Sequence, residues 1–352
     1  MVRVVDPGRG QALPALHVES LGFLSGDSDD TSHLEDPFEE LFARGVTDGL
    51  PVVPPTRARV EAAIAASGRR GDELIALVAP ALGRATVERI AVNAVMAGCR
   101  PEYMPTVIAG VEALCDEGFS LVGVSGTTDA VAPIFIVNGP ARGALGINAG
   151  AGVLGPGHRA NATIGRALRL VWVNLGGASD GAISMSTFGN PGRYACCFGE
   201  HEETSPWPPL HVEHGFAPDE STIAALPGEP LQVVVDGQSR TAADVLATVA
   251  RSLEVIASHR TASLGDTLLL VSPMHARTIA GDGWSKADAR RYLWERLETR
   301  REGPAPKFRA PEHLKLVVAG GTAGPFTGLI PGWPFADSPS RLVFKKIDTP
   351  SR

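Results

Sequence analysis

The sequence predicts an α/β fold: a mostly parallel sheet with helices on both faces and glycine-rich loops at the strand ends. Short apolar runs typical of buried strands alternate with longer segments whose apolar residues recur at helical spacing. Glycine and proline are abundant, at 40 and 28 of 352 residues, without a collagen-like period, so many tight turns are expected. We find no convincing internal repeat.

Three parts of the chain are expected. Residues 1–35 mix Pro, Gly, Ser and Asp without sustained periodicity, which is typical of a poorly ordered tail. Residues 36–225 are expected to form an α/β domain that carries a glycine-rich loop and a segment rich in Cys, His and Glu. The alternating pattern restarts near 221–229, so residues 226–352 are expected to form a smaller α/β domain, which allows two subdomains.

The individual elements follow from local signals. Pro37 stands at the first position of a helix with acidic residues in its first turn, and Ser285 is placed to cap another. Three prolines within 47–56 exclude a central strand there. The expected helices cover 36–45, 57–67, 86–99, 101–117, 159–175, 241–259 and 285–298. The expected strands cover 73–82, 120–128, 132–140, 231–237, 267–273, 314–320 and 341–347.

Composition limits the classes of function. The net charge of −7 is mildly acidic and not gathered in long runs, which argues against a nucleic-acid or anionic-membrane partner. No window approaches twenty continuous apolar residues, and the N-terminus lacks the layout of a secretory signal. Four cysteines without a CxxC pair predict reduced thiols in a cytoplasmic protein. Helix-rich apolar surfaces are compatible with a homodimer.

The stretch from Gly139 to Gly176 is the strongest indication of a binding site. Its glycine-dense loop leads into a helix start, where free N–H groups and a partial positive charge favour an anion. We therefore expect it to hold a carboxylate or phosphate; the alternative is that its arginines pair with carboxylates elsewhere. The predicted substrate-binding residues here are Asn148, Gly157, His158, Arg159, Asn161 and Arg166.

The same loop formally matches the dinucleotide fingerprint GxGxxG at Gly150, Gly152 and Gly155. The loop is long, however, Pro156 follows at once, and no acidic residue lies at the required distance, so a nicotinamide or flavin site is not favoured. No cofactor is predicted.

Cys99 is the leading candidate for a reactive group. A thiol beside Arg100 and next to a helix N-terminus is expected to have a lowered pKa, which suits a nucleophile or a redox thiol. The alternative is a small buried apolar residue, the more frequent fate of a free cysteine. Glu102 is the neighbouring catalytic candidate, and Arg100 and Tyr103 are expected to contact substrate.

A second group of candidates lies in the loop-rich segment from 182 to 216. Cys196 and Cys197 cannot easily bond to each other, so Cys197 is expected to face the site. Glu200, Glu202 or His211 are expected to move protons; a metal held by Cys, His and Glu is less favoured, because no HExxH-like spacing is present. Further substrate contacts are expected from Trp207, from His275 after a strand end, and from Lys286 at a helix start.

Several stretches resemble the UGSC-type (seleno)protein family, a group of largely uncharacterised bacterial proteins. They are TDGLPVVPPT (47–56), AVNAVMAGCRPEYMP (91–105), GPGHRANATIGRALRL (155–170), the RYACCFGEHEE…SPW…LHVE segment, GDGWSKAD and AGGTAGPFTG. The resemblance covers most of the chain from Asp36 onward and implies a thiol-associated, redox-related enzyme. The selenocysteine-Gly-Ser-Cys motif of the family, or a CGSC equivalent, is absent, which puts the redox role of that motif in doubt.

These observations predict a thiol-dependent enzyme that acts on a small anionic substrate, with Cys99 and Cys197 as a redox pair. Two alternatives stay open. One is a non-redox lyase or hydrolase that uses Cys99 or a bound metal in the same pocket. The other is a non-catalytic protein that binds a small molecule.

Overall fold

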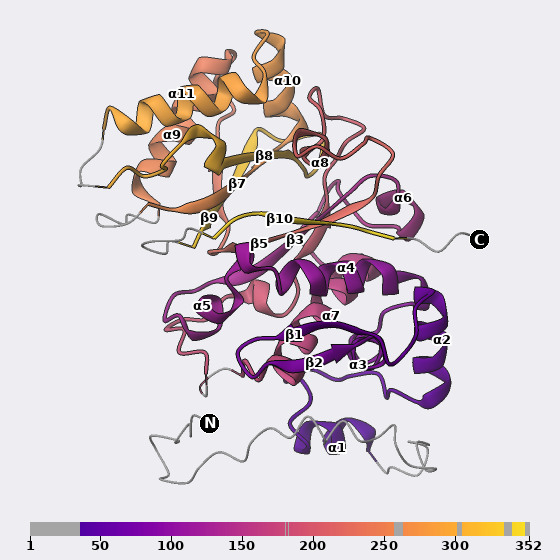
Figure 1. Ribbon diagram of the computed structural model, residues 1–352. Coiled ribbons are helices and arrows are strands. Elements are labelled where there is room, and N and C mark those ends of the chain that lie inside the picture. Colours follow the sequence, from indigo (N-terminus) through magenta and orange to yellow (C-terminus); the bar gives the residue numbers. More distant parts are fainter. Residues whose placement is uncertain are drawn as a thin grey trace.

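The structure, a computed structural model, describes residues 36–179, 181, 183–256, 263–300, 305–333 and 340–348. The predicted tail, 1–35, lies outside these residues. An eight-stranded sheet runs through the molecule in the order β4-β3-β5-β9-β7-β8, with β10 paired to β5 and β6 paired to β9 (Figure 1). Its strands are β3 (Ala132–Asn138), β4 (Cys197–Gly199), β5 (Thr222–Gly228), β6 (Gln232–Val235), β7 (Gly265–Val271), β8 (Leu314–Val318), β9 (Phe326–Gly332) and β10 (Val343–Lys346).

The sheet is mixed, so the expectation of a mostly parallel sheet needs correction. Among the described residues, β3 with β4 and β7 with β8 pair in parallel, and the other pairings of the sheet are antiparallel. The reason lies in β5 and β9, which the sequence analysis did not identify. Both are central strands that run against their neighbours, and each contains a Pro-Gly pair that resembles a turn signal.

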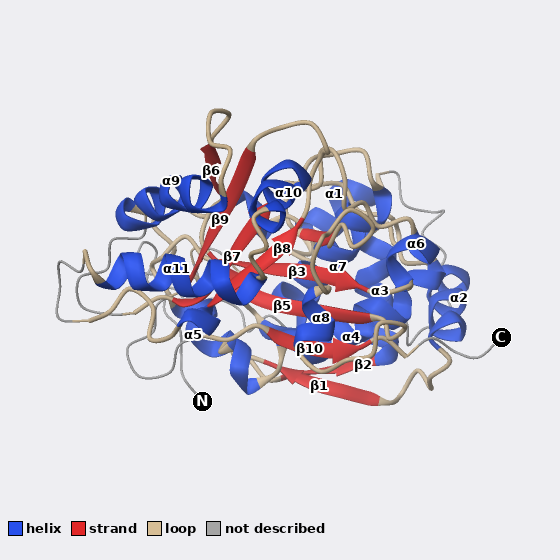
Figure 2. Cartoon of the chain, turned by 90° about the horizontal axis from the view of Figure 1, so that it is seen from above, coloured by secondary structure: helices blue, strands red, loops and turns tan. Residues whose placement is uncertain are grey.

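Helices cover the outer surface of the sheet on both sides (Figure 1). On one side, α2, α3, α4 and α7 pack with β3, β5 and β10 around one apolar core, and on the other α9, α10 and α11 pack with β6 to β9 around a second. The helices are α1 (Pro37–Ala43), α2 (Arg57–Ser67), α3 (Val87–Ala97), α4 (Met104–Leu114), α5 (Leu121–Gly126), α6 (Ala141–Leu145), α7 (Arg159–Gly176), α8 (Leu210–Glu213), α9 (Ala242–Val255), α10 (Pro273–Gly281) and α11 (Lys286–Glu298). A small sheet of β1 (Leu74–Val78) and β2 (Gly83–Thr86) lies at the edge of the molecule in Figure 2.

The inner face of the sheet forms a third core. Alternate residues of six strands, among them Ile134, Phe198, Leu268 and Val317, point into this shared interior. β4 and β8, the first and the last strand in the order of the sheet, also lie close to each other. The His201 N–H, just after β4, donates to the carbonyl of Val318, the last residue of β8, at 2.7 Å. The sheet is therefore curled rather than flat.

The main sheet contains an internal two-fold relation that the sequence analysis missed. β3, β4 and β5 are arranged as β7, β8 and β9 are: a strand, a parallel neighbour on one side, and an antiparallel neighbour on the other. The strand that follows each of these three-stranded units pairs with the other unit. β6, which follows β5, pairs with β9, whereas β10, which follows β9, pairs with β5.

The two halves meet at β5 and β9, where Gly228 faces Gly332 in antiparallel register. The hydrogen bonds around this point are reciprocal: Glu229 N–H donates to the Pro331 carbonyl at 2.8 Å, and Trp333 N–H donates to the Pro227 carbonyl at 3.2 Å. Residues that the two-fold relation makes equivalent therefore form equivalent hydrogen bonds. The two halves share the short segments LPG (226–228) and IPG (330–332) at this junction.

Most local predictions are confirmed. Asp36 caps α1 through bonds to the backbone N–H groups of Phe38 and Glu39, and Ser285 forms a capping box with Asp288 at the start of α11. The predicted strand 120–128 is wrong: it contains α5, whose buried Leu121 and Val124 follow helical spacing. The predicted strand 73–82 contains β1, which is partly exposed, not buried.

The predicted domain boundary after residue 225 falls inside β5. This strand joins the two halves of the main sheet, so the chain continues through the centre of the fold at that point. Within the described part of the chain, no helix has both the length and the apolar character needed to cross a bilayer.

The close approach at the β5–β9 junction gives a test of this architecture. A Cβ on Gly332 would lie 2.2 Å from the carbonyl oxygen of Asp266, a backbone atom of β7 that cannot move alone. Gly332→Ala should therefore lower the free energy of unfolding by roughly 3 kcal/mol, measured by urea denaturation. The control is Gly281→Ala at the end of α10, where a Cβ meets nothing within 4 Å and which should be neutral or slightly stabilising. Equal effects of the two substitutions would contradict the close packing.

Candidate functional site

The glycine-rich loop is held at the start of α7 by Asn161. Its side-chain oxygen accepts the Asn148 N–H at 2.8 Å, and its amide donates to the Asn148 carbonyl at 3.0 Å. His158 occupies the N-cap position without a side-chain capping bond, and Gly157 before it has φ +104°, a conformation that favours glycine. Asn148 and Asn161 therefore shape the loop, and these contacts account for them without a ligand.

The loop also joins the two ends of the curled sheet. The Gly199 N–H at the end of β4 donates to the Asn148 carbonyl at 3.0 Å, and the Gly320 N–H after β8 donates to the Ala149 carbonyl at 2.8 Å. The two glycine-rich loops, 148–157 and 320–324, thus lie together, a point that the sequence leaves open.

Arg166 on α7 is engaged by a carboxylate. Its Nε and Nη2 atoms donate to the two oxygens of Asp48 at 2.8 and 2.7 Å, and Nη2 also bonds the Leu50 carbonyl. For Arg166, this bidentate ion pair agrees with the alternative given in the sequence analysis, that the arginines pair with carboxylates elsewhere in the chain. It fixes the 47–56 segment on α7.

Cys99, Arg100 and Arg159 come together at one cavity of about 360 Å³, which we call the Cys99 pocket. It lies between α2, the end of α3 and the start of α7. Arg159 donates from Nε and Nη2 to the Gly98 carbonyl at 3.0 and 2.9 Å, next to the thiol. The pocket is lined by Val53, Ala58, Arg59, Ala62, Ala63, Ala94, Val95, Gly98, Cys99, Arg100, Pro101, Met104 and Arg159.

The thiols are not activated in the way that the sequence predicted. Burial raises the pKa of Cys99 to about 12, outweighing the hydrogen bond that its thiol donates to the Thr163 carbonyl and the nearby charge of Arg159. Arg100 does not supply the expected activation; it lies 3.9 Å from Glu102, and both side chains are exposed. The expected lowering of the Cys99 pKa is therefore wrong.

Cys197, at the start of β4, is buried against α7 beside Gly165. Burial raises its pKa, and the neighbouring Cys196 and Cys99 raise it further, which places the Cys197 and Cys99 thiols within electrostatic reach of each other. All four cysteines are free thiols.

Glu200 and Lys286 form a buried ion pair instead of an open acid–base site. Lys286 Nζ lies 3.4 Å from Glu200 and donates to Glu213 at 3.0 Å and to the Pro208 carbonyl at 2.8 Å. Glu200 also accepts the Asn138 amide and the Leu210 N–H, each at 2.7 Å. With these partners, the pair joins α11 to the end of β3 and to the 200–213 segment.

Glu202 and His211 lie in the same 200–213 segment but have different environments. Glu202 accepts bonds from the Asn138 amide, the Gly139 N–H and Arg142 Nε at 2.8 to 3.0 Å. His211 is fully buried, and neither of its ring nitrogens has a hydrogen-bond partner among the described residues. His211 is therefore enclosed by the fold and is not placed as an accessible proton carrier.

The remaining candidates have structural contacts. Tyr103, the residue before α4, is buried in the apolar core. Trp207 Nε1 donates to the Trp284 carbonyl at 2.9 Å, and His275 bridges Thr327 and the Asp236 carbonyl at 2.9 and 3.1 Å. Among the described residues, no group of three or more His, Cys, Asp or Glu side chains is arranged to hold a metal ion.

Sequence reasoning missed several residues that shape these sites. Arg59 and Met104 line the Cys99 pocket, yet each belongs to a helix whose pattern indicates only packing. Asn138, Arg142 and Glu213 complete the buried ionic groups from three different elements. The one available signal was a polar Asn138 at the end of an otherwise apolar strand, the place where α/β proteins gather functional side chains.

The buried ion pair predicts a large stability effect. Lys286→Met would leave Glu200 without its cation in the interior and should lower the free energy of unfolding by about 3 kcal/mol or more, measured by denaturant titration. The matched control is Lys346→Met: its ion pair with Glu220, at 2.8 Å, is exposed, so the unfolding free energy should stay unchanged within error. Equal losses in both variants would contradict the buried network.

Comparison of the chain with protein-family models, with curated proteins and with solved structures gives no match.

Proposed function

We propose that the protein binds a small organic anion in the Cys99 pocket, with the charged group of the ligand at the arginines and its apolar body against the walls. The observation that carries this proposal is the composition of the lining: Arg59, Arg100 and Arg159 provide three positive charges, and none of the described residues that line the cavity is acidic. A carboxylate or a phosphate is the group that guanidinium donors recognise best.

The hydrogen bonds of these arginines support a binding role. Arg159 uses two of its donors on the Gly98 carbonyl, and Arg59 uses Nη1 on the Pro54 carbonyl at 2.9 Å. A guanidinium has five N–H donors, so both side chains are anchored while most of their donors have no partner among the described residues. Anchored cations with spare donors lose little side-chain entropy when an anion binds.

The rest of the pocket favours a ligand with an apolar body. Eight of its lining residues are Val, Ala, Pro or Met, contributed by α2, α3 and the segments beside them. A volume of about 360 Å³ suits a small metabolite and lies at the lower end of the range for ligand sites. A short-chain or branched carboxylate combines both features.

In this proposal Cys99 forms part of the wall as a neutral thiol. With a pKa of about 12, roughly one thiol in 100,000 is ionised at pH 7. A neutral thiol is a weak nucleophile, and a bound anion would hold the proton more firmly still. Binding is therefore better supported than thiol chemistry.

The second candidate function is the thiol-dependent enzyme predicted from sequence. One observation favours it: Cys99 and Cys197 contact neighbouring residues of α7, Cys99 at the Thr163 carbonyl and Cys197 at Gly165, and Cys99 lines a pocket with three cations. For this function, a substrate or a conformational change would have to supply the base that removes the Cys99 proton. The redox and the non-redox versions share that requirement.

The binding proposal is tested by protection of Cys99. Iodoacetamide labelling, with peptide mass spectrometry, should be slowed by hexanoate more than by acetate, because the apolar chain adds contact with the pocket. Arg159→Gln should weaken this protection about tenfold, the size of one charge-assisted hydrogen bond.

Two controls belong to this experiment. Labelling of Cys115, which lies outside the pocket, should not respond to hexanoate. Arg251 is an exposed arginine on α9. In the Arg251→Gln protein, hexanoate should slow the labelling of Cys99 as much as it does in the unsubstituted protein. Absence of protection by any carboxylate would overturn the proposal.

The pH dependence of labelling separates the two candidate functions. Only the thiolate reacts, so a pKa near 12 predicts slow labelling at pH 7 and a rate that rises about tenfold per pH unit up to pH 10. An activated thiol would instead reach a plateau below pH 8. Such a plateau at Cys99, with Cys115 still slow, would favour the thiol enzyme.

A further inference from the structure

Strand β6 and the start of β9 present an apolar face to solvent at the edge of the molecule (Figure 2). Leu231, just before β6, lies on the same side of the strand as Val233 and Val235, and the three side chains are 40%, 59% and 60% exposed. Phe326, which pairs with Val235, is 43% exposed. We call these four residues the β6 face. An exposed apolar face on a strand of this kind is typical of a surface that another segment covers.

The internal two-fold relation of the sheet gives the β6 face a counterpart in the other half. Val233 of β6 pairs with the residue four positions before Gly332. Phe344 of β10 pairs with the residue four positions before Gly228, the glycine that faces Gly332 at the junction of the halves. Val233 and Phe344 therefore occupy equivalent positions.

The counterpart of the β6 face is covered by residues 208–216. The rings of His214 and Phe216 have centroids 4.6 and 5.8 Å from that of Phe344, and Leu210 is buried in the inner core against which Phe344 packs. This covering segment belongs to the long connection between β4 and β5.

The connection in the other half is much shorter. Only residues 319–325 lie between β8 and β9, whereas residues 200–221 lie between β4 and β5. Within the described part of the chain, the β6 face therefore has no equivalent cover, which accounts for the exposure of its apolar side chains.

The sequence of the covering segment recurs near the start of the chain. Residues 208–216 read PPLHVEHGF, and residues 14–23 read PALHVESLGF. The two segments share the tetrapeptide LHVE, a proline two positions before it, and a Gly-Phe pair after it. Phe23 corresponds in this alignment to Phe216, the residue whose ring contacts Phe344.

From these observations we infer that residues 14–23 dock on the β6 face of their own chain, as residues 208–216 cover its counterpart, with Phe23 against Val233. Burial of apolar surface on both sides favours this contact. The twelve residues 24–35 connect the segment to α1 and can span about 40 Å, twice the radius of gyration expected for a chain of this length. The contact involves none of the residues that line the Cys99 pocket.

Disulfide cross-linking in the full chain tests the docking. In the double variant Phe23→Cys, Val233→Cys, oxidised glutathione should produce a disulfide between the two substituted positions within one chain, identified by peptide mass spectrometry of the monomer band from a non-reducing gel. The matched control is Phe23→Cys, Val122→Cys. Val122 lies on α5 and is 65% exposed, close to the value for Val233, and this pair should give at most a tenth of the cross-link.

Hydrogen exchange gives a second readout without new thiols. The amides of residues 14–23 should exchange at least tenfold more slowly than those of an unfolded peptide of the same sequence. Val233→Asp should remove this protection, because docking would then bury a carboxylate, whereas Val122→Asp should preserve it. The Val233 side chain is largely exposed, so its substitution leaves the core intact, which thermal unfolding checks.

Two results would overturn the inference from the exchange data: exchange of residues 14–23 at the rate of the unfolded peptide in the unsubstituted protein, or protection that persists in a folded Val233→Asp protein. In the cross-linking experiment, equal yields from the two cysteine pairs would overturn it as well. A disulfide found mainly in a dimer band would overturn docking within one chain, because a second copy would then supply the segment.

Discussion

The antiparallel contact of β5 with β9 is the constraint on which the main sheet depends. Gly228 and Gly332 face each other there, and a Cβ on either residue would meet neighbouring atoms at 2.5 Å or less. The reciprocal bonds of Glu229 and Trp333 close the contact on both sides. Because β6 and β10 each cross to the opposite half, neither half can complete its own sheet without the other.

Curling of the sheet determines where polar groups gather. The ends of β4 and β8 meet, and the loop 148–151 is bonded to both of them. The ion pair of Glu200 and Lys286 and the carboxylate of Glu202 lie just beyond the strand ends and are covered by the 200–213 segment. Buried and paired charges of this kind fix the position of one segment against another. They differ from charges that line a cavity, which a ligand can reach.

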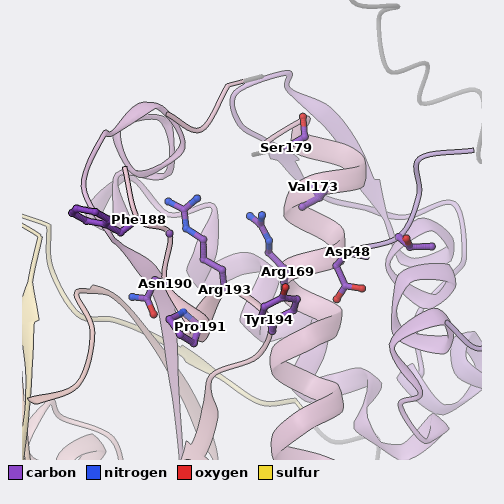
Figure 3. Close-up of a pocket in the computed structure, with 11 residues that line it drawn as sticks. Asp48, Arg169, Val173, Ser179, Phe188, Asn190, Pro191, Arg193 and Tyr194 are labelled. Carbon is purple, nitrogen blue, oxygen red and sulfur yellow. The ribbon is translucent and has the colours of Figure 1, made fainter. Parts of the chain in front are cut away.

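Helix α7 connects two cavities of the molecule. Its first residue, Arg159, lines the Cys99 pocket, and Arg169 lines a second cavity, of about 480 Å³, together with Arg193 (Figure 3). Between them Arg166 fixes Asp48, and the buried side of the helix carries Ile164 and Leu168 in the core. One amphipathic helix therefore positions cations at two cavities while its apolar face holds it in place.

The sequence by itself determined the local elements with strong patterns: the capped helices α1 and α11, the long helix α7 with its apolar stripe, and the apolar strands β3 and β7. It also indicated that Cys99, Arg100 and Arg159 belong together, because they lie in the stretches that resemble one family. The direction and order of the strands were decided by tertiary structure, since β5 and β9 resemble turn-rich segments and pair only with strands distant in the chain. Tertiary structure also decided the state of the thiols: a neighbouring arginine is visible in sequence, but the burial that raises the pKa of Cys99 to about 12 depends on how α7 packs over it.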